Sequence, residues 1–116
     1  MSVDAGEPVE SLDQLATRGA AETPLMREAQ RVADATKPYE LRATDKDICV
    51  RALFSANAPA KAWFEDDSKS PRGDVANGST SSLVPPKGPA CARKGETLKL
   101  VIEGATTARA VIWQSP

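Results

Sequence analysis

The sequence predicts a mainly β protein, an antiparallel β-sandwich of six or seven short strands preceded by one or two short α-helices. Apolar and polar residues alternate in several short stretches after residue 38, and turn-forming Gly, Pro and Asn residues separate these stretches. No helical pattern follows that could connect parallel strands. The length of 116 residues fits one domain, because smaller units bury too little of their surface to be stable alone.

Residues 1–22 are predicted to form a flexible acidic tether that contains a short helix. Before Ser11 the residues are small, acidic and interrupted by Gly and Pro, a composition that buries little apolar surface. Ser11 and Gln14 match a capping box, and Gly19 is suited to end the short helix that follows. We expect the residues before this helix to be mobile.

Residues 23–37 are predicted to form an amphipathic helix. Thr23-Pro24 is a typical N-cap followed by a first helical residue. Leu25, Ala29 and Val32 recur at helical spacing and form a narrow apolar stripe. Two uses of this stripe are open, because it can pack on the sheet of its own domain or dock onto a partner.

Residues 38–116 are predicted to form the β-sandwich. The expected strands lie at 47–55, 60–65, 74–76, 82–84, 97–103 and 107–113. Asn57-Ala58-Pro59 is expected to join the first two strands, and Asn77-Gly78 predicts a two-residue hairpin. The proline-rich stretch 85–89 is a connection, because proline cannot donate a hydrogen bond to a sheet.

The two cysteines, Cys49 and Cys91, are predicted to form a structural disulfide. Closing a loop of this length contributes on the order of 4 kcal/mol in the chain-entropy model. The alternative is two buried free thiols in a cytosolic protein. A structural zinc site needs four ligands, whereas the chain has two cysteines and no histidine. We therefore expect no metal and no cofactor.

Charge and hydropathy exclude two classes of partner. The formal net charge is −1, from 15 basic and 16 acidic residues that are mixed along the chain, so nucleic-acid binding is not expected. The first residues have no basic and apolar signal pattern, and the longest apolar run is too short to cross a bilayer. An export signal, if the chain is exported, is expected to have been removed.

One short segment and the overall organisation resemble exported proteins. The stretch 93–100, with Gly95-Glu96 before an alternating strand, resembles the start of a strand in extracellular jelly-roll and pre-peptidase C-terminal-like domains. Immunoglobulin spacing is not met, because Pro89 stands where such domains have a tyrosine. The acidic tether, helical arm and disulfide-linked sheet together resemble the mature part of a small bacterial exported protein or lipoprotein. This resemblance implies a periplasmic, outer-membrane-surface or secreted location, with a lipid anchor in the native precursor as one option, and a binding or accessory role.

The aromatic residues are the candidate ligand contacts. Trp63, Trp113 and Tyr39 are predicted to form a stacking platform for a sugar or peptide, with charged Lys61 and Glu65 on the same strand as Trp63. The competing interpretation places the aromatic rings in the core, because the chain has only five of them.

Three short motifs receive ordinary interpretations. The acidic run 65–67 matches no calcium-loop spacing and is predicted to be a solvated loop. Arg72-Gly73-Asp74 spells an integrin-binding tripeptide, but such tripeptides occur by chance and no integrin binding is predicted. Asn77-Gly78-Ser79 matches a glycosylation acceptor, although a turn accounts for the same residues.

The sequence favours a non-enzymatic, secreted or cell-envelope binding module that contacts protein or glycan. The alternative is a structural or assembly component that docks through the predicted helix at 24–36. A small hydrolase ranks last, because a serine nucleophile has no histidine to activate it.

Overall fold

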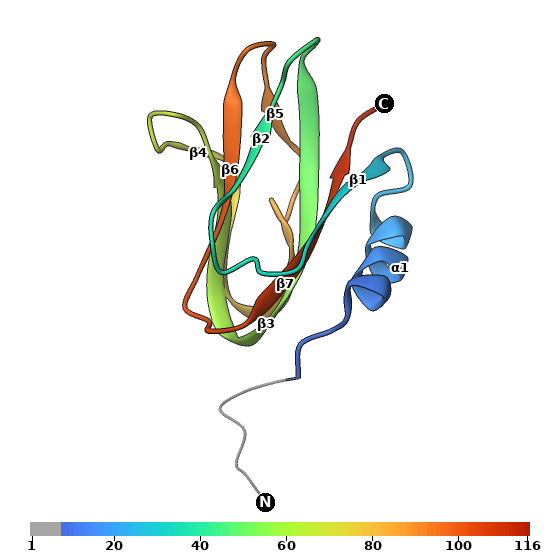
Figure 1. The fold of residues 1–116 in the computed structure, drawn as a ribbon, viewed down its shortest axis with the longest axis vertical. Coiled ribbons are helices and arrows are strands. Elements are labelled where there is room, and N and C mark those ends of the chain that lie inside the picture. The colour runs from blue at the N-terminus through green and yellow to red at the C-terminus, as the bar shows by residue number, and fades with distance from the viewer. Residues whose placement is uncertain (1–7) are drawn as a thin grey trace, which may run out of the picture.

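The computed structural model describes residues 8–116, which form one helix followed by seven strands. All seven strands belong to one antiparallel sheet, which confirms the predicted mainly β class (Figure 1). The elements are α1 (Leu12–Glu22), β1 (Arg27–Val32), β2 (Tyr39–Arg42), β3 (Ile48–Glu65), β4 (Pro71–Val84), β5 (Ala90–Ala92), β6 (Thr97–Glu103) and β7 (Ala108–Gln114). The first part of the predicted mobile tether, residues 1–7, lies outside the described residues.

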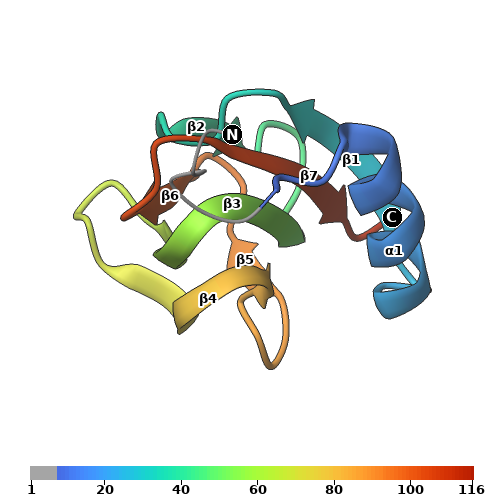
Figure 2. The same ribbon diagram turned by 90° about the horizontal axis from the view of Figure 1, so that it is seen from below.

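The sheet is curled because its longest strand bends. β3 has 18 residues, and its first half pairs with β7 whereas its second half pairs with β6. The strand order is β1-β7-β3-β6-β2, and β4 and β5 both pair with β3. The bend in the middle of β3, at the bottom of Figure 1, therefore curls the single sheet around the core (Figures 1 and 2), and the predicted division into the two sheets of a sandwich is not confirmed.

The main hydrophobic core fills the inside of the curl. Its largest fully buried members alternate along the strands with residues that point outward, as expected for half-buried strands. They are Phe54, Phe64, Leu98, Leu100, Ile112, Val50 and Val84. A second, smaller cluster lies on the outside of the curl, where α1 covers β7 and β3 (Figure 2).

α1 begins as predicted and ends later than predicted. Ser11 Oγ accepts a hydrogen bond from the backbone N–H of Gln14, and the Gln14 side chain accepts one from the N–H of Ser11. This confirms the capping box. Gly19 does not end the helix, which continues to Glu22. The glycine is needed for packing, because a Cβ on Gly19 would lie 2.0 Å from Cη2 of Trp113.

The predicted helix at 23–37 is wrong. Residues Arg27–Val32 form β1, which pairs antiparallel with β7. Intrinsic helix propensity is a weak preference, and hydrogen bonds to a neighbouring strand override it here. The boundary at residue 38 is therefore also wrong, since the sheet begins at Arg27.

Two predicted turns are irregularities within strands. Asn57-Ala58-Pro59 does not separate two strands, because β3 continues through it with shifts in its register against β4. Asn77-Gly78 is not a hairpin, because both residues lie inside β4. Gly78 has a φ of +85° and is the extra residue where the pairing shifts from Lys61–Asn77 to Ala60–Ser79. A bulge uses the same left-handed glycine as a tight turn.

The predicted disulfide is confirmed. Cys49 on β3 and Cys91 on β5 are directly opposite each other, with their Cα atoms 4.0 Å apart. The bond therefore ties the three-residue strand β5 to the central strand of the sheet. The stretch between β4 and β5 is a connection, as its prolines predicted.

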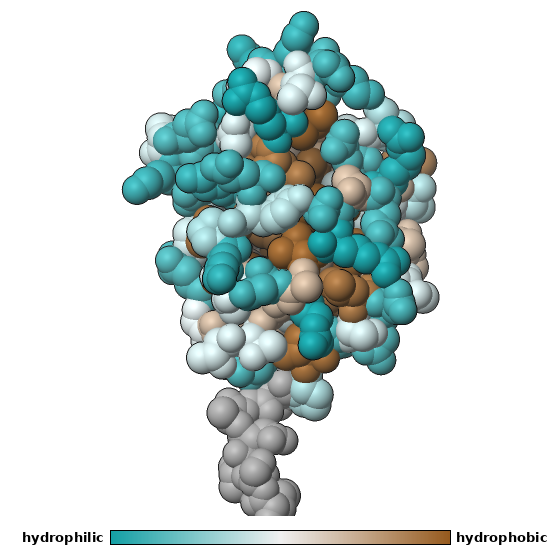
Figure 3. All heavy atoms as spheres, viewed as in Figure 1, coloured by the Kyte–Doolittle hydropathy of each residue, from teal (hydrophilic) through white to brown (hydrophobic). Residues whose placement is uncertain are grey.

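The side of the molecule between the end strands β1 and β2 has a mixed surface. Figure 3 shows apolar atoms in the middle of this side, with polar side chains along both flanks. Tyr39 and Leu41 of β2 are half-buried against the core.

None of the helical segments in residues 8–116 has the length and apolar character that crossing a bilayer requires.

Candidate binding face

Trp63 lies on the outer surface of the second half of β3. Its neighbours Ala62 and Phe64 are fully buried in the core, so the alternation of the strand turns Trp63 outward, where it is half-buried. Its indole Nε1–H donates to Oε1 of Glu65 at 2.9 Å, and Nζ of Lys61 lies 5.5 Å from the ring centroid. A hydrogen bond and a cation–π contact thus orient this tryptophan.

The neighbouring strands extend the surface around Trp63. On β6, Val101 is opposite Trp63, Lys99 is opposite Glu65, and Glu103 is opposite Lys61. On β2, Glu40 is opposite Lys99, with Oε2 and Nζ 3.8 Å apart. We call these residues the Trp63 face: Lys61, Trp63, Glu65, Lys99, Val101, Glu103 and Glu40.

The charges on the Trp63 face alternate in sign across the strands. Each lysine is opposite at least one glutamate, an arrangement that stabilises neighbouring strands by a few tenths of a kcal/mol per pair. The carboxylates accept and the ammonium groups donate hydrogen bonds around an aromatic and aliphatic centre. Such a face offers both polar and apolar contact to a partner.

Only part of the predicted aromatic platform forms. Lys61, Trp63 and Glu65 are brought together as the alternation predicted. Tyr39 is not part of this face, because it pairs with the buried Leu100 and packs against the core on the opposite side of the sheet.

Trp113 is not a ligand contact either, since only 2% of its surface is exposed. Its ring packs beneath α1 against Leu15, Leu53 and Val111. The prediction that Trp113 and Tyr39 join Trp63 in a platform is therefore wrong, and the interpretation as core residues holds for Trp113.

The sequence analysis missed the residues that β6 and β2 contribute. Lys99, Val101 and Glu103 alternate with apolar residues in the predicted strand 97–103, which was the available signal. Their position next to Trp63 depends on which strands pair and in what register. That information is not contained in the alternation of a single strand.

The apolar stripe predicted to contact a partner does not form, because residues 27–32 are a strand and not part of a helix. Leu25 is 86% exposed just before β1, and Ala29 is exposed on β1. Val32 is buried in the core. The three side chains therefore form no common docking stripe.

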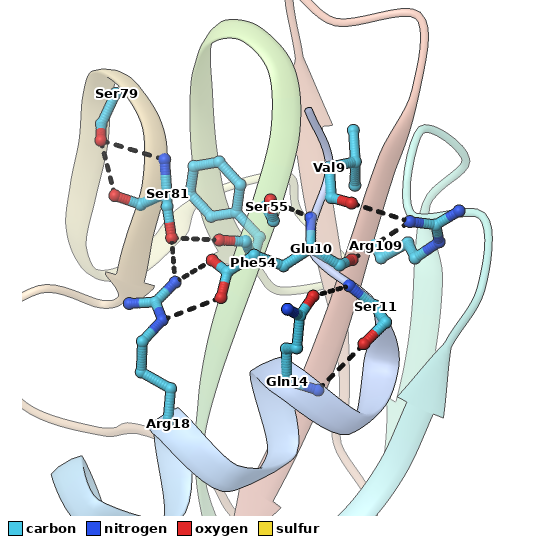
Figure 4. Close-up of polar contacts among 10 residues, drawn as sticks. All are labelled: Val9, Glu10, Ser11, Gln14, Arg18, Phe54, Ser55, Ser79, Ser81 and Arg109. Atoms are coloured by element: carbon cyan, nitrogen blue, oxygen red, sulfur yellow. Dashed lines mark hydrogen bonds and ion pairs between the residues drawn. The ribbon is translucent and has the colours of Figure 1, made fainter. Parts of the chain in front are cut away.

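A polar network attaches the N-terminal arm to the sheet (Figure 4). Arg109 Nη1 donates to the carbonyl oxygens of Val9 and Glu10 at 3.2 and 3.1 Å, and Ser55 Oγ accepts from the N–H of Glu10 at 2.9 Å. Arg18 forms an ion pair with Glu10 and donates to Ser81 Oγ. Val9 and Glu10 are thus fixed to the sheet, in contrast to the mobile tether that was predicted.

The acidic loop after β3 is also structural. Oδ1 of Asp66 accepts hydrogen bonds from Ser68 and Ser70, and Oδ2 accepts one from Arg72. The Ser68 hydroxyl and the Ser70 N–H are the leading reasons that the pKa of Asp66 falls to about 2. Arg72 in turn donates hydrogen bonds to Oε2 of Glu96 and to the carbonyl oxygen of Cys91, each at 2.9 Å. The arginine of the Arg-Gly-Asp tripeptide is therefore already bound within the protein.

No family model, curated protein or solved structure with which the chain was compared matches it.

Proposed function

We propose that this chain is a non-enzymatic, extracytoplasmic binding module that contacts a protein or glycan of the cell envelope through the Trp63 face. The observation that supports this most is the outward position of Trp63, with its ring oriented by Glu65 and Lys61. Large aromatic side chains are enriched among the residues that dominate binding energy.

The preorganisation of Trp63 favours binding. An ordered ring loses little rotamer freedom when a partner covers it, so more of the contact energy appears as affinity. Trp63 and Val101 supply apolar contact, and the surrounding carboxylates and ammonium groups supply hydrogen bonds. A face formed by strand side chains suits an extended polymer, such as a polypeptide or a polysaccharide.

The disulfide supports the proposed compartment. Structural disulfides persist in oxidising environments and are rare in the cytosol of mesophiles. Cys91 is exposed on an outer strand, where a reducing cytosol would have access to it. An exported protein, secreted or anchored through its N-terminal arm, fits this location.

The Trp63→Ala variant tests the proposed face. Immobilised wild-type protein and variant are probed with an array of bacterial surface polysaccharides, with purified peptidoglycan and with purified envelope proteins. We expect any ligand of the wild type to bind Trp63→Ala at least about tenfold more weakly, as for a central aromatic contact. Leu25→Ala is the matched control, because Leu25 is exposed but lies outside the Trp63 face.

The control is expected to bind like the wild type, and circular dichroism is expected to show that all three proteins are folded. A ligand that binds folded Trp63→Ala as tightly as the wild type would contradict the proposed face.

A further inference from the structure

β1 is an end strand of the sheet, and its second edge has no strand neighbour among residues 8–116. Residues 27–31 are exposed along this edge. Leu25, just before the strand, is the one large hydrophobic side chain that is exposed in the described part of the chain. An open strand edge is a template for pairing with another strand, and proteins commonly protect such edges with charges and bulges.

A bulge in β1 sets the positions of its charged residues. The pairing with β7 shifts between Glu28 and Gln30, so Glu28 is opposite Trp113 and Arg31 is opposite Val111. Trp113 and Val111 both lie on the face that α1 covers. Residues three apart in a regular strand point to opposite faces, but the bulge places Glu28 and Arg31 on the same face. The Arg31 side chain binds Glu28 at 2.7 Å and Asp13 at 2.6 Å.

We propose that the free edge of β1 pairs antiparallel with β1 of a second copy of this chain. A two-fold axis between Ala29 and Gln30 puts Glu28 opposite Arg31 of the second copy, and Arg31 opposite Glu28 of the second copy. The bulge keeps both members of each pair on the same face, as antiparallel pairing requires. The interface is thus self-complementary in charge, which a two-fold homodimer needs.

The charge pattern selects the second copy as the occupant. Charged residues protect an edge when pairing would bring like charges together. Here the two-fold axis brings opposite charges together, so the charges of β1 do not repel its own copy. Continued past the ends of β1, the same register places Met26 opposite the exposed Ala33 of the second copy.

Two charge-reversed variants test this pairing. Arg31→Glu makes both members of each proposed pair acidic, and Glu28→Arg makes both members basic. Sedimentation velocity is measured for the full chain over a concentration series, for the wild type, for each variant alone and for an equimolar mixture of the variants. Lys87→Glu, at an exposed residue in the connection between β4 and β5, is the control for a charge reversal away from β1 and from the Trp63 face.

We expect the wild type and Lys87→Glu to form dimers as the concentration rises. Each β1 variant alone is expected to dimerise at least about tenfold more weakly, because two opposite-charge pairs become like-charge pairs. The mixture is expected to form a heterodimer, since acidic and basic edges again complement each other. Circular dichroism of each variant shows whether it is folded.

A wild type that stays monomeric at millimolar concentration would overturn the proposal. So would folded β1 variants that dimerise as well as the wild type, or a mixture that associates no better than its components.

Discussion

The two tryptophans occupy opposite environments, so we expect different roles for them at the level of single residues. Trp113 is buried beneath α1 and contacts a cluster of apolar side chains. Trp63 is half-buried on the outer surface and bonds to charged neighbours on its own strand. Trp113 supplies packing energy, whereas Trp63 keeps part of its ring exposed, where the proposed partner would contact it.

Alanine at the two tryptophan positions is expected to have different effects on stability. Trp113→Ala removes a fully buried ring and should lower the free energy of unfolding by about 3–5 kcal/mol. Trp63→Ala should lower it by only about 1 kcal/mol, since surface residues contribute little. Urea unfolding of both variants measures the difference. Equal losses would show that Trp63 is a core residue and not a binding residue.

Asp66 is expected to make the stability depend on acid. Its pKa in the folded chain is about 2, below the ordinary value of 3.8, so the carboxylate stabilises the fold above pH 3.8. This contribution is lost as the pH falls from 3.8 towards 2. Asp66→Asn should therefore flatten the decrease in unfolding free energy over this window, measured by urea unfolding at each pH. A wild-type slope in folded Asp66→Asn would contradict this account.

At the level of elements, the contact between α1 and β7 depends on a glycine. Gly19 faces the ring of Trp113 so closely that no Cβ fits between them. In an isolated helix alanine would be favoured over glycine by about 1 kcal/mol. The packing contact reverses this preference.

Gly19→Ala is thus expected to destabilise the protein, by about 1–3 kcal/mol as for other overpacked sites. In a Trp113→Phe background the atom that a new Cβ would contact most closely is absent. There Gly19→Ala should be neutral or stabilising. Thermal or urea unfolding of the four proteins measures this coupling, and a stabilising Gly19→Ala in the wild-type background would contradict the contact.

Strands with clear alternation were predicted well, and elements that depend on distant partners were not. The alternation of 97–103 matches β6, and the capping box at Ser11 matches the start of α1. The residues of β1 have the composition of a helix, and only pairing with β7, far along the sequence, makes them a strand. Gly78 forms a bulge in place of a hairpin because β4 continues along β3 on both sides of it.

The sequence predicted the residues that β3 contributes to the candidate site, but not those that β6 and β2 contribute. Lys61, Trp63 and Glu65 share a face because they alternate on one strand, which a sequence displays directly. The residues of β6 and β2 join them only through register. The disulfide was predictable from two cysteines in a chain without histidine, but its role in pairing neighbouring strands required the fold.

At the level of the whole molecule, one bent strand and one disulfide organise the sheet. β3 pairs with four other strands, and the bond from Cys49 to Cys91 fastens the shortest of them. The curl buries one side of the sheet in the core and leaves the Trp63 face on the other. Under the proposed function the sheet is a small support for the Trp63 face, and the disulfide fits the proposed extracytoplasmic location because such bonds persist in oxidising compartments.

The most direct test of an exported, disulfide-linked module is the intact mass of the protein isolated from its native cells. The protein is denatured and treated with a thiol-alkylating reagent, with and without prior reduction. We predict that no thiol is alkylated before reduction and that Cys49 and Cys91 are both alkylated after it. Two alkylated thiols without reduction would contradict both the disulfide and the extracytoplasmic location.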